Sequence, residues 1–206
     1  MTAHTPIDTD FLASARAQAA RRSHHPRGTV RCVGVPLFRN KLARDCACLF
    51  DFAPDILSWS CLPLELSDTR SFHVPDFKIE RATGLTLVDV FQSLDDASVR
   101  WIKERALEAG YQHDVVMEQQ INSGFRLRNA QDLLRYARWR TPLGDRLRLL
   151  AALDEHGTMT VTECLSAFRE TLPIAGLASL ILHRFLEVEL DDELINPDTT
   201  VRRRRD

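Results

Sequence analysis

Two aspartates, Asp76 and Asp89, lie on neighbouring segments whose residues alternate between apolar and polar, 72–80 and 85–91. A turn centred between residues 82 and 83 would make these segments an antiparallel pair in which Asp76 faces Asp89. Two carboxylates about 4 Å apart repel by roughly 4 kcal/mol at an effective dielectric constant near 20, so such a pair calls for a cation. Mg²⁺ takes one or two carboxylates together with water and phosphate oxygens, and the spacing predicts Asp76 and Asp89 as its ligands. The alternative is two solvated aspartates, because a one-residue slip in register separates them.

A lysine beside the two acids would complete a site for cutting DNA. In such sites a Pro-Asp pair is followed on the next strand by an acid, any residue and a lysine, and strand periodicity puts that lysine on the same face as the acid. There it can orient the attacking water or help to deprotonate it. The residue two positions after Asp89 is Phe91, which carries no charge. Lys78, two positions after Asp76, is the candidate replacement, and the alternative is an exposed strand lysine.

The other residues that could take part in catalysis or metal binding form no complete site that the sequence alone can identify. His73 is expected on the strand face opposite Asp76, in a structural role. Whether His113 and Asp114 form a catalytic pair depends on spatial neighbours, which the sequence leaves open. The five cysteines show neither a CxxC pair nor metal-ligand spacing, so we expect reduced and mostly buried thiols. The three tryptophans are predicted to be core or edge residues.

The composition is that of a globular protein, with 206 residues of which 44% are hydrophobic and 27% charged. No apolar run approaches the roughly 20 residues of a membrane span. The first 22 residues lack the apolar core of a secretory signal. We therefore expect a cytoplasmic protein without membrane partners.

The net charge of -2 conceals an uneven distribution of basic residues. Residues 11–44 contain eight basic side chains and no acid, and residues 202–205 are all arginine. Basic blocks of this kind can neutralise nucleic-acid phosphates without reading sequence, and the alternative is a solvated arm. The candidate nucleic-acid-binding residues are Arg39, Lys41, Arg44, Arg203 and Arg204.

The order of elements indicates an α/β core preceded by a basic arm. Residues 1–28 form the arm, with a helix in 8–22, and residues 29–140 form the core. In the core, Asn40 is the expected N-cap of a helix, and 95–108 is expected to be a second helix that stops at Gly110. A third helix is expected to be capped at Asn129. The predicted strands are 56–66, 72–80, 85–91 and 111–118.

Residues 141–206 read as three helices followed by a β-hairpin around Asp191 and Asp192, which is the pattern of a winged helix. The candidate recognition helix, 172–184, is mostly apolar, and only Ser179, His183 and Arg184 suit contacts with phosphates or bases. Because that composition is poor for reading DNA sequence, we expect a protein-docking module.

Several stretches in order along the chain resemble the TnsA-type endonuclease subunit of heteromeric transposases. They are RNKLARDCACLFDFAPDILSWSCLPLEL, FHVPDFKI, LTLVDVFQ and EAGYQHDVVMEQQI with RLRNAQDLLRYAR. The resemblance covers about residues 30–140 and continues into the C-terminal region. It implies a restriction-endonuclease-like core, a mixed β-sheet flanked by helices, that nicks the 5′ ends of a transposon with Mg²⁺. It also implies a DDE transposase and an AAA+ ATPase regulator as partners.

The sequence departs from the family pattern at two catalytic positions. The glutamate of the family pattern S-x-x-E-R-D falls on Ala43, and the lysine of its acid-x-lysine motif falls on Phe91. Pro75-Asp76 is kept, and the second acid is Asp89. Loss of an acid–base group typically lowers a rate by about 10²- to 10⁴-fold, so we expect lost or weak cleavage.

Three functions are consistent with the sequence. The first is a TnsA-like subunit that binds transposon-end DNA, the transposase and the ATPase without cutting efficiently. The second is an active Mg²⁺-dependent endonuclease with a rearranged site of Asp76, Asp89 and Lys78. The third is a winged-helix regulator or scaffold.

Overall fold

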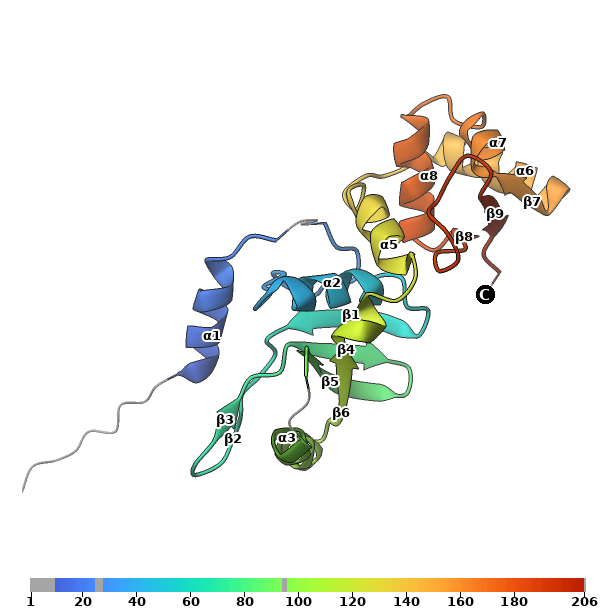
Figure 1. The fold of residues 1–206 in the computed structure, drawn as a ribbon. Coiled ribbons are helices and arrows are strands. Elements are labelled where there is room, and N and C mark those ends of the chain that lie inside the picture. Colours follow the sequence, from blue (N-terminus) through green and yellow to red (C-terminus); the bar gives the residue numbers. More distant parts are fainter. Residues whose placement is uncertain (1–9, 25–27, 94–95, 206) are drawn as a thin grey trace, which may run out of the picture.

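A mixed four-stranded sheet with the strand order β1-β4-β5-β6 forms the centre of the N-terminal half of the chain (Figure 1). The computed structural model describes residues 10–24, 28–93 and 96–205. The first three strands in this order are antiparallel, and β6 runs parallel to β5. The strands are β1 (Ile56–Cys61), β4 (Phe77–Arg81), β5 (Gly84–Phe91) and β6 (Gln112–Met117). The predicted α/β class is therefore confirmed.

The hairpin of β4 and β5 has the register predicted from the sequence. Phe77 pairs with Val88 and Lys78 with Leu87, and Gly84 begins the second strand at a φ of 134° that favours glycine. Continuing this pairing by one residue brings Asp76 beside Asp89, and the backbone N–H of Asp76 donates to Oδ1 of Asp89 at 3.2 Å. The two aspartates are thus neighbours at the end of the hairpin.

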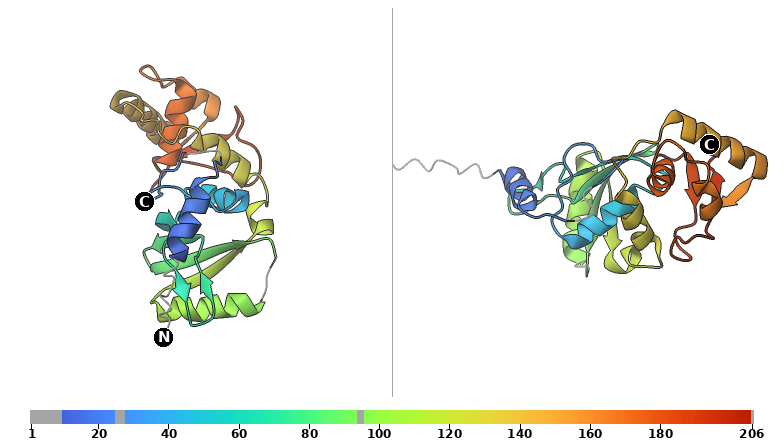
Figure 2. Two further views of the ribbon diagram at one scale, coloured as in Figure 1. Left: turned by 90° about the vertical axis from the view of Figure 1, so that its left-hand side faces the viewer. Right: turned by 90° about the horizontal axis from the view of Figure 1, so that it is seen from above.

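Two helices cover the opposite faces of the sheet (Figure 2). Helix α2 (Lys41–Phe50) begins at the predicted N-cap, where Asn40 Oδ1 accepts from the Ala43 N–H at 2.8 Å. It packs its buried residues on the face that carries Phe77, Ile79, Val88 and Val90. Helix α3 (Asp96–Glu108) packs on the other face, where its residues Ile102 and Ala106 join Leu87 in a smaller cluster. The start of this helix was expected at Asp95, which lies outside the described residues.

The predicted strand 72–80 is wrong as one continuous strand. It is divided into β3 (Phe72–His73), which pairs with β2 (Leu66–Ser67), and β4, which begins at Phe77. Pro75 stands in the interruption, and its lack of an N–H together with its fixed φ disfavours a continuous ladder. The alternation that places side chains on faces therefore does not run from His73 to Asp76.

The basic arm includes a helix that packs on the core. Helix α1 (Phe11–Ala20) starts at Asp10, whose side chain accepts from the Ala13 N–H. The rings of Phe11 and Phe72 stack with centroids 3.6 Å apart, and Arg16 donates to the carbonyl oxygen of Leu62 at 2.9 Å. Residues 10–24 are therefore not a free solvated arm, while residues 1–9 and 25–27 of the predicted arm lie outside the description.

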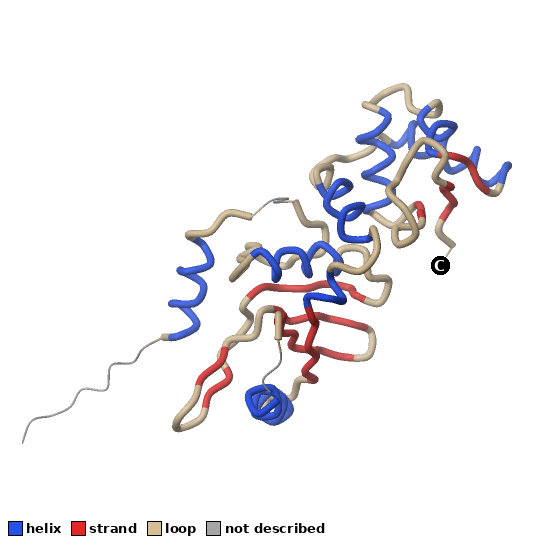
Figure 3. The backbone as a smooth tube through the Cα atoms, in the orientation of Figure 1, coloured by secondary structure: helices blue, strands red, loops and turns tan. Residues whose placement is uncertain are grey.

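The C-terminal half contains three helices and a three-stranded antiparallel sheet with the order β7-β9-β8 (Figure 3). The elements are α6 (Leu143–His156), β7 (Thr158–Thr160), α7 (Val161–Leu165), α8 (Pro173–Leu182), β8 (Leu186–Val188) and β9 (Thr200–Arg203). The hairpin expected around Asp191 and Asp192 is wrong, because β8 pairs with β9 across a loop. Consequently, Arg202 and Arg203 belong to the central strand of this sheet and not to a tail.

The two halves are joined through α5 (Arg126–Leu134), which follows the short helix α4 (Glu118–Ile121). Leu133 and Leu134 of α5 and Cys48 of α2 share one apolar cluster with the C-terminal helices. Asn129, expected to be an N-cap, lies inside α5. Its side chain donates to the carbonyls of residues 190 and 193 and accepts from the N–H of residue 195. These bonds occupy the backbone of the loop that was expected to form a strand.

Candidate functional site

Asp89 lies at the centre of a buried polar cluster between β5, β6 and β3. Its side chain points to the α3 face of the sheet, as does that of Leu87, and the parallel pairing of Leu87 with His113 brings His113 to the same face. His113 Nε2 lies 2.9 Å from Asp89 Oδ2. His73 Nε2 lies 2.9 Å from each of the two carboxylate oxygens. Together with the Asp76 N–H, three donor groups therefore surround one carboxylate.

These contacts set the ionisation of Asp89. Its exposed fraction is 1%, and burial alone would raise the pKa of its carboxyl group. The hydrogen bonds from His113 and His73 outweigh that effect and lower the pKa of Asp89 to about 2. Asp89 is therefore a stable anion held by its two histidines.

Asp76 has a different environment from its neighbour. Its Oδ2 accepts from the Val90 N–H at 3.0 Å, and its Oδ1 lies 3.2 Å from Nε of Arg39 without a hydrogen bond. Burial and the nearby charge of Asp89 raise the pKa of Asp76 to about 6, against the opposing effect of Arg39. Arg39 is fixed in place because its guanidinium also donates to the carbonyl of Val74. The two aspartates therefore titrate in separate pH ranges.

The residues present do not fit a Mg²⁺ ion in this arrangement. Both oxygens of Asp89 and one oxygen of Asp76 already accept hydrogen bonds from the protein. The remaining oxygen of Asp76 faces the guanidinium of Arg39, whose charge repels a cation. Over residues 10–24, 28–93 and 96–205, no group of three or more histidine, cysteine, aspartate or glutamate side chains could hold a metal ion.

The placement of His73 on the face opposite Asp76 is corrected, because His73 contacts Asp89. The prediction used a period of two across residues 73–76, which the interruption at Pro75 breaks. His113 also has Asp89 as its partner and not Asp114, whose exposed side chain lies 3.8 Å from Arg81. The contact of Asp89 with His113 could have been found from the sequence only by aligning two parallel strands separated by α3.

Lys78, the candidate replacement lysine, lies in β4 with its Cα opposite Leu87. This pairing puts Lys78 on the same face of the sheet as Asp89. Among the ion pairs of the described residues, however, none joins Lys78 to Asp76 or Asp89. The structure therefore places Lys78 near the site without a contact to either carboxylate.

The two positions at which the sequence departs from the resembled family pattern have different surroundings. Ala43 is 1% exposed and packs between α2 and the sheet, where the surrounding cluster is apolar. Phe91 is half-buried and packs with the residues that face α3. Alanine and phenylalanine therefore contribute apolar packing at positions where a site for cutting DNA would need charge.

The candidate nucleic-acid-binding residues do not form one surface. Arg39 is engaged with Asp76, and Arg44 is buried with an exposed fraction of 7% and pairs with Asp45. Lys41 is exposed at the start of α2. Two further candidates belong to the other half of the molecule, where Arg203 pairs with Asp154 and the half-buried Arg204 lines a cavity.

The polar residues of the candidate recognition helix are all engaged. Ser179 is buried and donates to the carbonyl of Trp139, and His183 Nε2 lies 2.9 Å from a guanidinium nitrogen of Arg140. Arg184 donates to carbonyl oxygens of the N-terminal half. Helix α8 therefore contributes to the core and not to an exposed reading surface.

Comparison with known proteins does not identify this chain. No protein-family model and no curated protein matches its sequence. Among the helices described, none is long and apolar enough to cross a membrane.

Proposed function

We propose that this chain is a TnsA-like subunit of a heteromeric DNA transposition machinery that has lost efficient cutting. The observation that carries the proposal is the pair Asp76 and Asp89 at the end of the β4–β5 hairpin, with both carboxylates bound by groups of the protein itself. The hairpin has the place of an endonuclease site in the resembled family. Its anions are balanced by Arg39 and hydrogen-bonded by two histidines, so the site has a structural role.

The arrangement of elements supports this family assignment. A mixed sheet covered on both faces by helices is compatible with a restriction-endonuclease-like core. The order of three helices and a three-stranded antiparallel sheet in residues 141–205 is compatible with a winged helix. The proposed partners are transposon-end DNA, a DDE transposase subunit and an AAA+ ATPase regulator.

Partner docking is the role we assign to the C-terminal half. Leu172 and Ile174, at the start of α8, have exposed fractions of 65% and 61%, whereas the polar residues of that helix are engaged inside the protein. Exposed apolar side chains of this size favour contact with another protein over contact with phosphates.

A nicking assay on supercoiled plasmid tests the proposal. The wild-type chain and the variant Asp76→Asn are each incubated with plasmid in Mg²⁺ and in Mn²⁺. We expect both to leave the plasmid supercoiled, because no carboxylate oxygen is open to a metal ion without displacing Arg39. Metal-dependent nicking that is present in the wild type and abolished in Asp76→Asn would overturn the proposal. It would favour instead an active endonuclease that uses Asp76, Asp89 and Lys78.

Binding to DNA is tested separately, by fluorescence anisotropy with a labelled duplex at several salt concentrations. The exposed Lys41 at the start of α2 is expected to contact phosphate, so Lys41→Gln should weaken binding and reduce the dependence on salt. The matched control is Lys103→Gln, which removes an exposed lysine from α3. Absence of any DNA binding by the full chain at low salt would contradict the DNA-associated role.

A further inference from the structure

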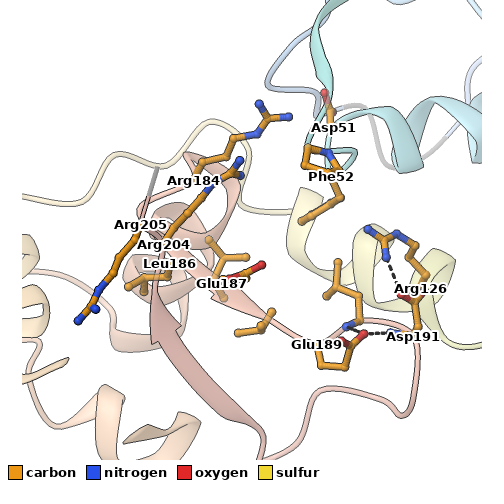
Figure 4. Close-up of a pocket in the computed structure, with 14 residues that line it drawn as sticks. Asp51, Phe52, Arg126, Arg184, Leu186, Glu187, Glu189, Asp191, Arg204 and Arg205 are labelled. Carbon is orange, nitrogen blue, oxygen red and sulfur yellow. Dashed lines mark hydrogen bonds and ion pairs between the residues drawn. The ribbon is translucent and has the colours of Figure 1, made fainter. Parts of the chain in front are cut away.

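A cavity of about 330 Å³ lies at the junction of the two halves of the molecule (Figure 4). Its walls come from the residues after α2, from the start of α5, from the end of α8 and from β8 with the loop after it. Residues 204 and 205 line it as well. Figure 4 shows Arg184, Arg204 and Arg205 together on one side of the cavity, which we call the arginine side.

Arg184 is held in place without a carboxylate partner. Its guanidinium donates to the carbonyl oxygens of Ala53 and Ile56, the latter at 3.0 Å. Carbonyl oxygens accept hydrogen bonds but do not neutralise a full positive charge. The residue also has a φ of 61°, in the left-handed region that favours glycine or asparagine. A cation is therefore fixed at the cavity wall without an ion pair, and the charges of Asp51 and Asp55 offset it only from a distance.

Arg204 and Arg205 add two more positive charges beside it. The Arg204 N–H donates to the carbonyl of Phe185 at 3.1 Å, which fixes the backbone at this point. In the described part of the chain, no hydrogen bond or ion pair joins the guanidinium of Arg204 or Arg205 to another residue. Both guanidinium groups are thus unpaired, and that of Arg204 lies close enough to Arg31 and Arg184 for its charge to act on them.

Arg31 lies close enough to Arg184 and Arg204 for their charges to change its pKa. Burial, followed by the charge of Arg184, lowers the pKa of Arg31 to about 10, and Arg204 acts in the same direction. Asp51 is the nearby acid that opposes these effects. Its oxygens, however, accept from the N–H groups of residues 30 and 31 and from Trp59 Nε1. One buried carboxylate therefore faces several arginines.

The other acids that line the cavity have partners of their own. Asp191 pairs with Arg126 at 2.6 Å on the opposite side (Figure 4), and Glu187 pairs with Arg202 at 3.0 Å. Glu189 accepts from the backbone N–H groups of residues 190 and 191. Glu189 keeps its negative charge, because backbone N–H groups do not neutralise it, but it lies on the side of Asp191 and Arg126 (Figure 4). The arginine side therefore carries more positive charge than Asp51, its nearby acid, can balance.

We propose that the arginine side of this cavity binds a phosphate group. Guanidinium groups bind phosphate oxygens through paired N–H donors, and a fixed arginine with unpaired arginines beside it suits a doubly or singly charged phosphate. The group belongs either to the backbone of a nucleic acid or to a free phosphate compound such as a nucleotide. The inference does not rest on the proposed function, because it is carried by the arginines and their lack of anionic partners.

Thermal unfolding of the full chain with inorganic phosphate tests for the site. KCl of equal ionic strength serves as the reference that removes general salt effects. We expect phosphate to raise Tm above this reference, and Arg204→Gln to weaken the apparent affinity roughly tenfold by removing a charge-assisted hydrogen bond. Arg204 is the position to substitute, because its guanidinium makes no hydrogen bond within the described residues. The guanidinium of Arg184, in contrast, donates to two backbone carbonyls, so its removal could destabilise the fold.

The matched control is Arg138→Gln, which removes an exposed arginine that does not line the cavity. Phosphate affinity should be unchanged in this variant. The proposal is overturned if phosphate raises Tm no more than KCl does, or if Arg138→Gln weakens phosphate binding as much as Arg204→Gln.

The source of the phosphate is distinguished by two further probes, a labelled 12-base-pair duplex and adenosine monophosphate. If Arg204→Gln weakens binding of the duplex and inorganic phosphate competes with it, the site takes a nucleic-acid backbone. If Arg204→Gln weakens binding of the nucleotide and leaves the duplex unaffected, the site takes a free phosphate compound. In the second case the phosphate site is supported even if the full chain does not bind DNA, so the two proposals are tested independently.

Discussion

His113 Nε2 on β6 lies 2.9 Å from Oδ2 of Asp89 on β5, and both side chains are buried. The contact crosses two parallel strands whose residues are 24 positions apart in the chain. It links Asp89, one of the two acids predicted as metal ligands, to a histidine for which the sequence indicated no partner. A buried carboxylate that accepts these hydrogen bonds stabilises the sheet. Because its oxygens are already hydrogen-bonded, it is a poor ligand for an added metal ion.

Asp89→Asn should lower the free energy of unfolding by roughly 2 kcal/mol at pH 7. The folded pKa of Asp89 is about 2, below its ordinary value of 3.8, so its contribution is fully present above pH 3.8. That contribution is lost as the pH falls toward 2. Urea denaturation followed by tryptophan fluorescence at several pH values measures the effect.

The control for this experiment is Asp192→Asn, at an exposed aspartate in the C-terminal half. It should change the free energy of unfolding by less than about 0.5 kcal/mol at every pH. A loss in Asp89→Asn no larger than in this control would show that the two histidine contacts contribute nothing to stability.

Asp76→Asn should show the opposite dependence on pH. The folded pKa of Asp76 is about 6, above its ordinary value of 3.8, so the folded wild-type protein binds the proton more tightly than the unfolded chain does. The stability of the wild type therefore falls by on the order of 3 kcal/mol as the pH rises from 3.8 to 6, and this group changes it no further at higher pH. Asparagine does not titrate, so the variant should gain on the wild type over this window.

The measurement is how the difference in free energy of unfolding between variant and wild type changes with pH. Its absolute value is less informative, because removing the Asp76 charge also leaves Arg39 without its counter-ion, which shifts the stability of the variant by an additional amount. Free energies of unfolding at pH 4, 5, 6 and 7 define it. A difference between variant and wild type that stays constant from pH 4 to pH 7 would contradict the raised pKa of Asp76.

Ala43→Glu, which introduces the glutamate of the resembled family pattern, should destabilise the protein and should not confer cleavage. Ala43 is almost fully buried among apolar residues, and an added unpaired carboxylate there should lower the free energy of unfolding by about 3 kcal/mol or more. The matched control is Ala151→Glu, at an exposed position in α6, which should cost less than about 1 kcal/mol. Thermal unfolding measures both. An Ala43→Glu variant as stable as this control would show that the core can accommodate the glutamate.

Asn129→Ala should loosen the loop that follows β8. The substitution removes three hydrogen bonds to residues 190, 193 and 195 and should lower the free energy of unfolding by about 3 kcal/mol. Asn122→Ala, at an exposed asparagine after α4, is the control and should have little effect. Amide hydrogen exchange should speed up at residue 195 in Asn129→Ala alone. Unchanged protection there would contradict the role of Asn129 in holding this loop.

Much of the fold followed from local patterns. The β4–β5 register was predicted because the turn at residues 82–83 and the two alternating segments are adjacent in sequence. The start of α2 followed from the Asn40 cap, and the end of α3 from Gly110, whose φ is 83°. The predicted position of His73 was wrong because a single proline interrupts the strand. The predicted hairpin after α8 was wrong because Asn129, some 60 residues away in sequence, forms hydrogen bonds with the backbone groups of the expected strand.

The sequence by itself determined that Asp76 and Asp89 stand side by side and that positions 43 and 91 hold Ala43 and Phe91, which carry no charge. These facts depend on residue identity and on pairing between neighbouring segments. The tertiary structure alone decided which groups surround the aspartates and which arginines gather at the cavity. Arg39, His113 and Arg204 come from segments distant in the chain, and packing of helices and a parallel strand brings them to their positions. Such contacts depend on how whole elements pack, for which no short stretch of sequence carries a signal.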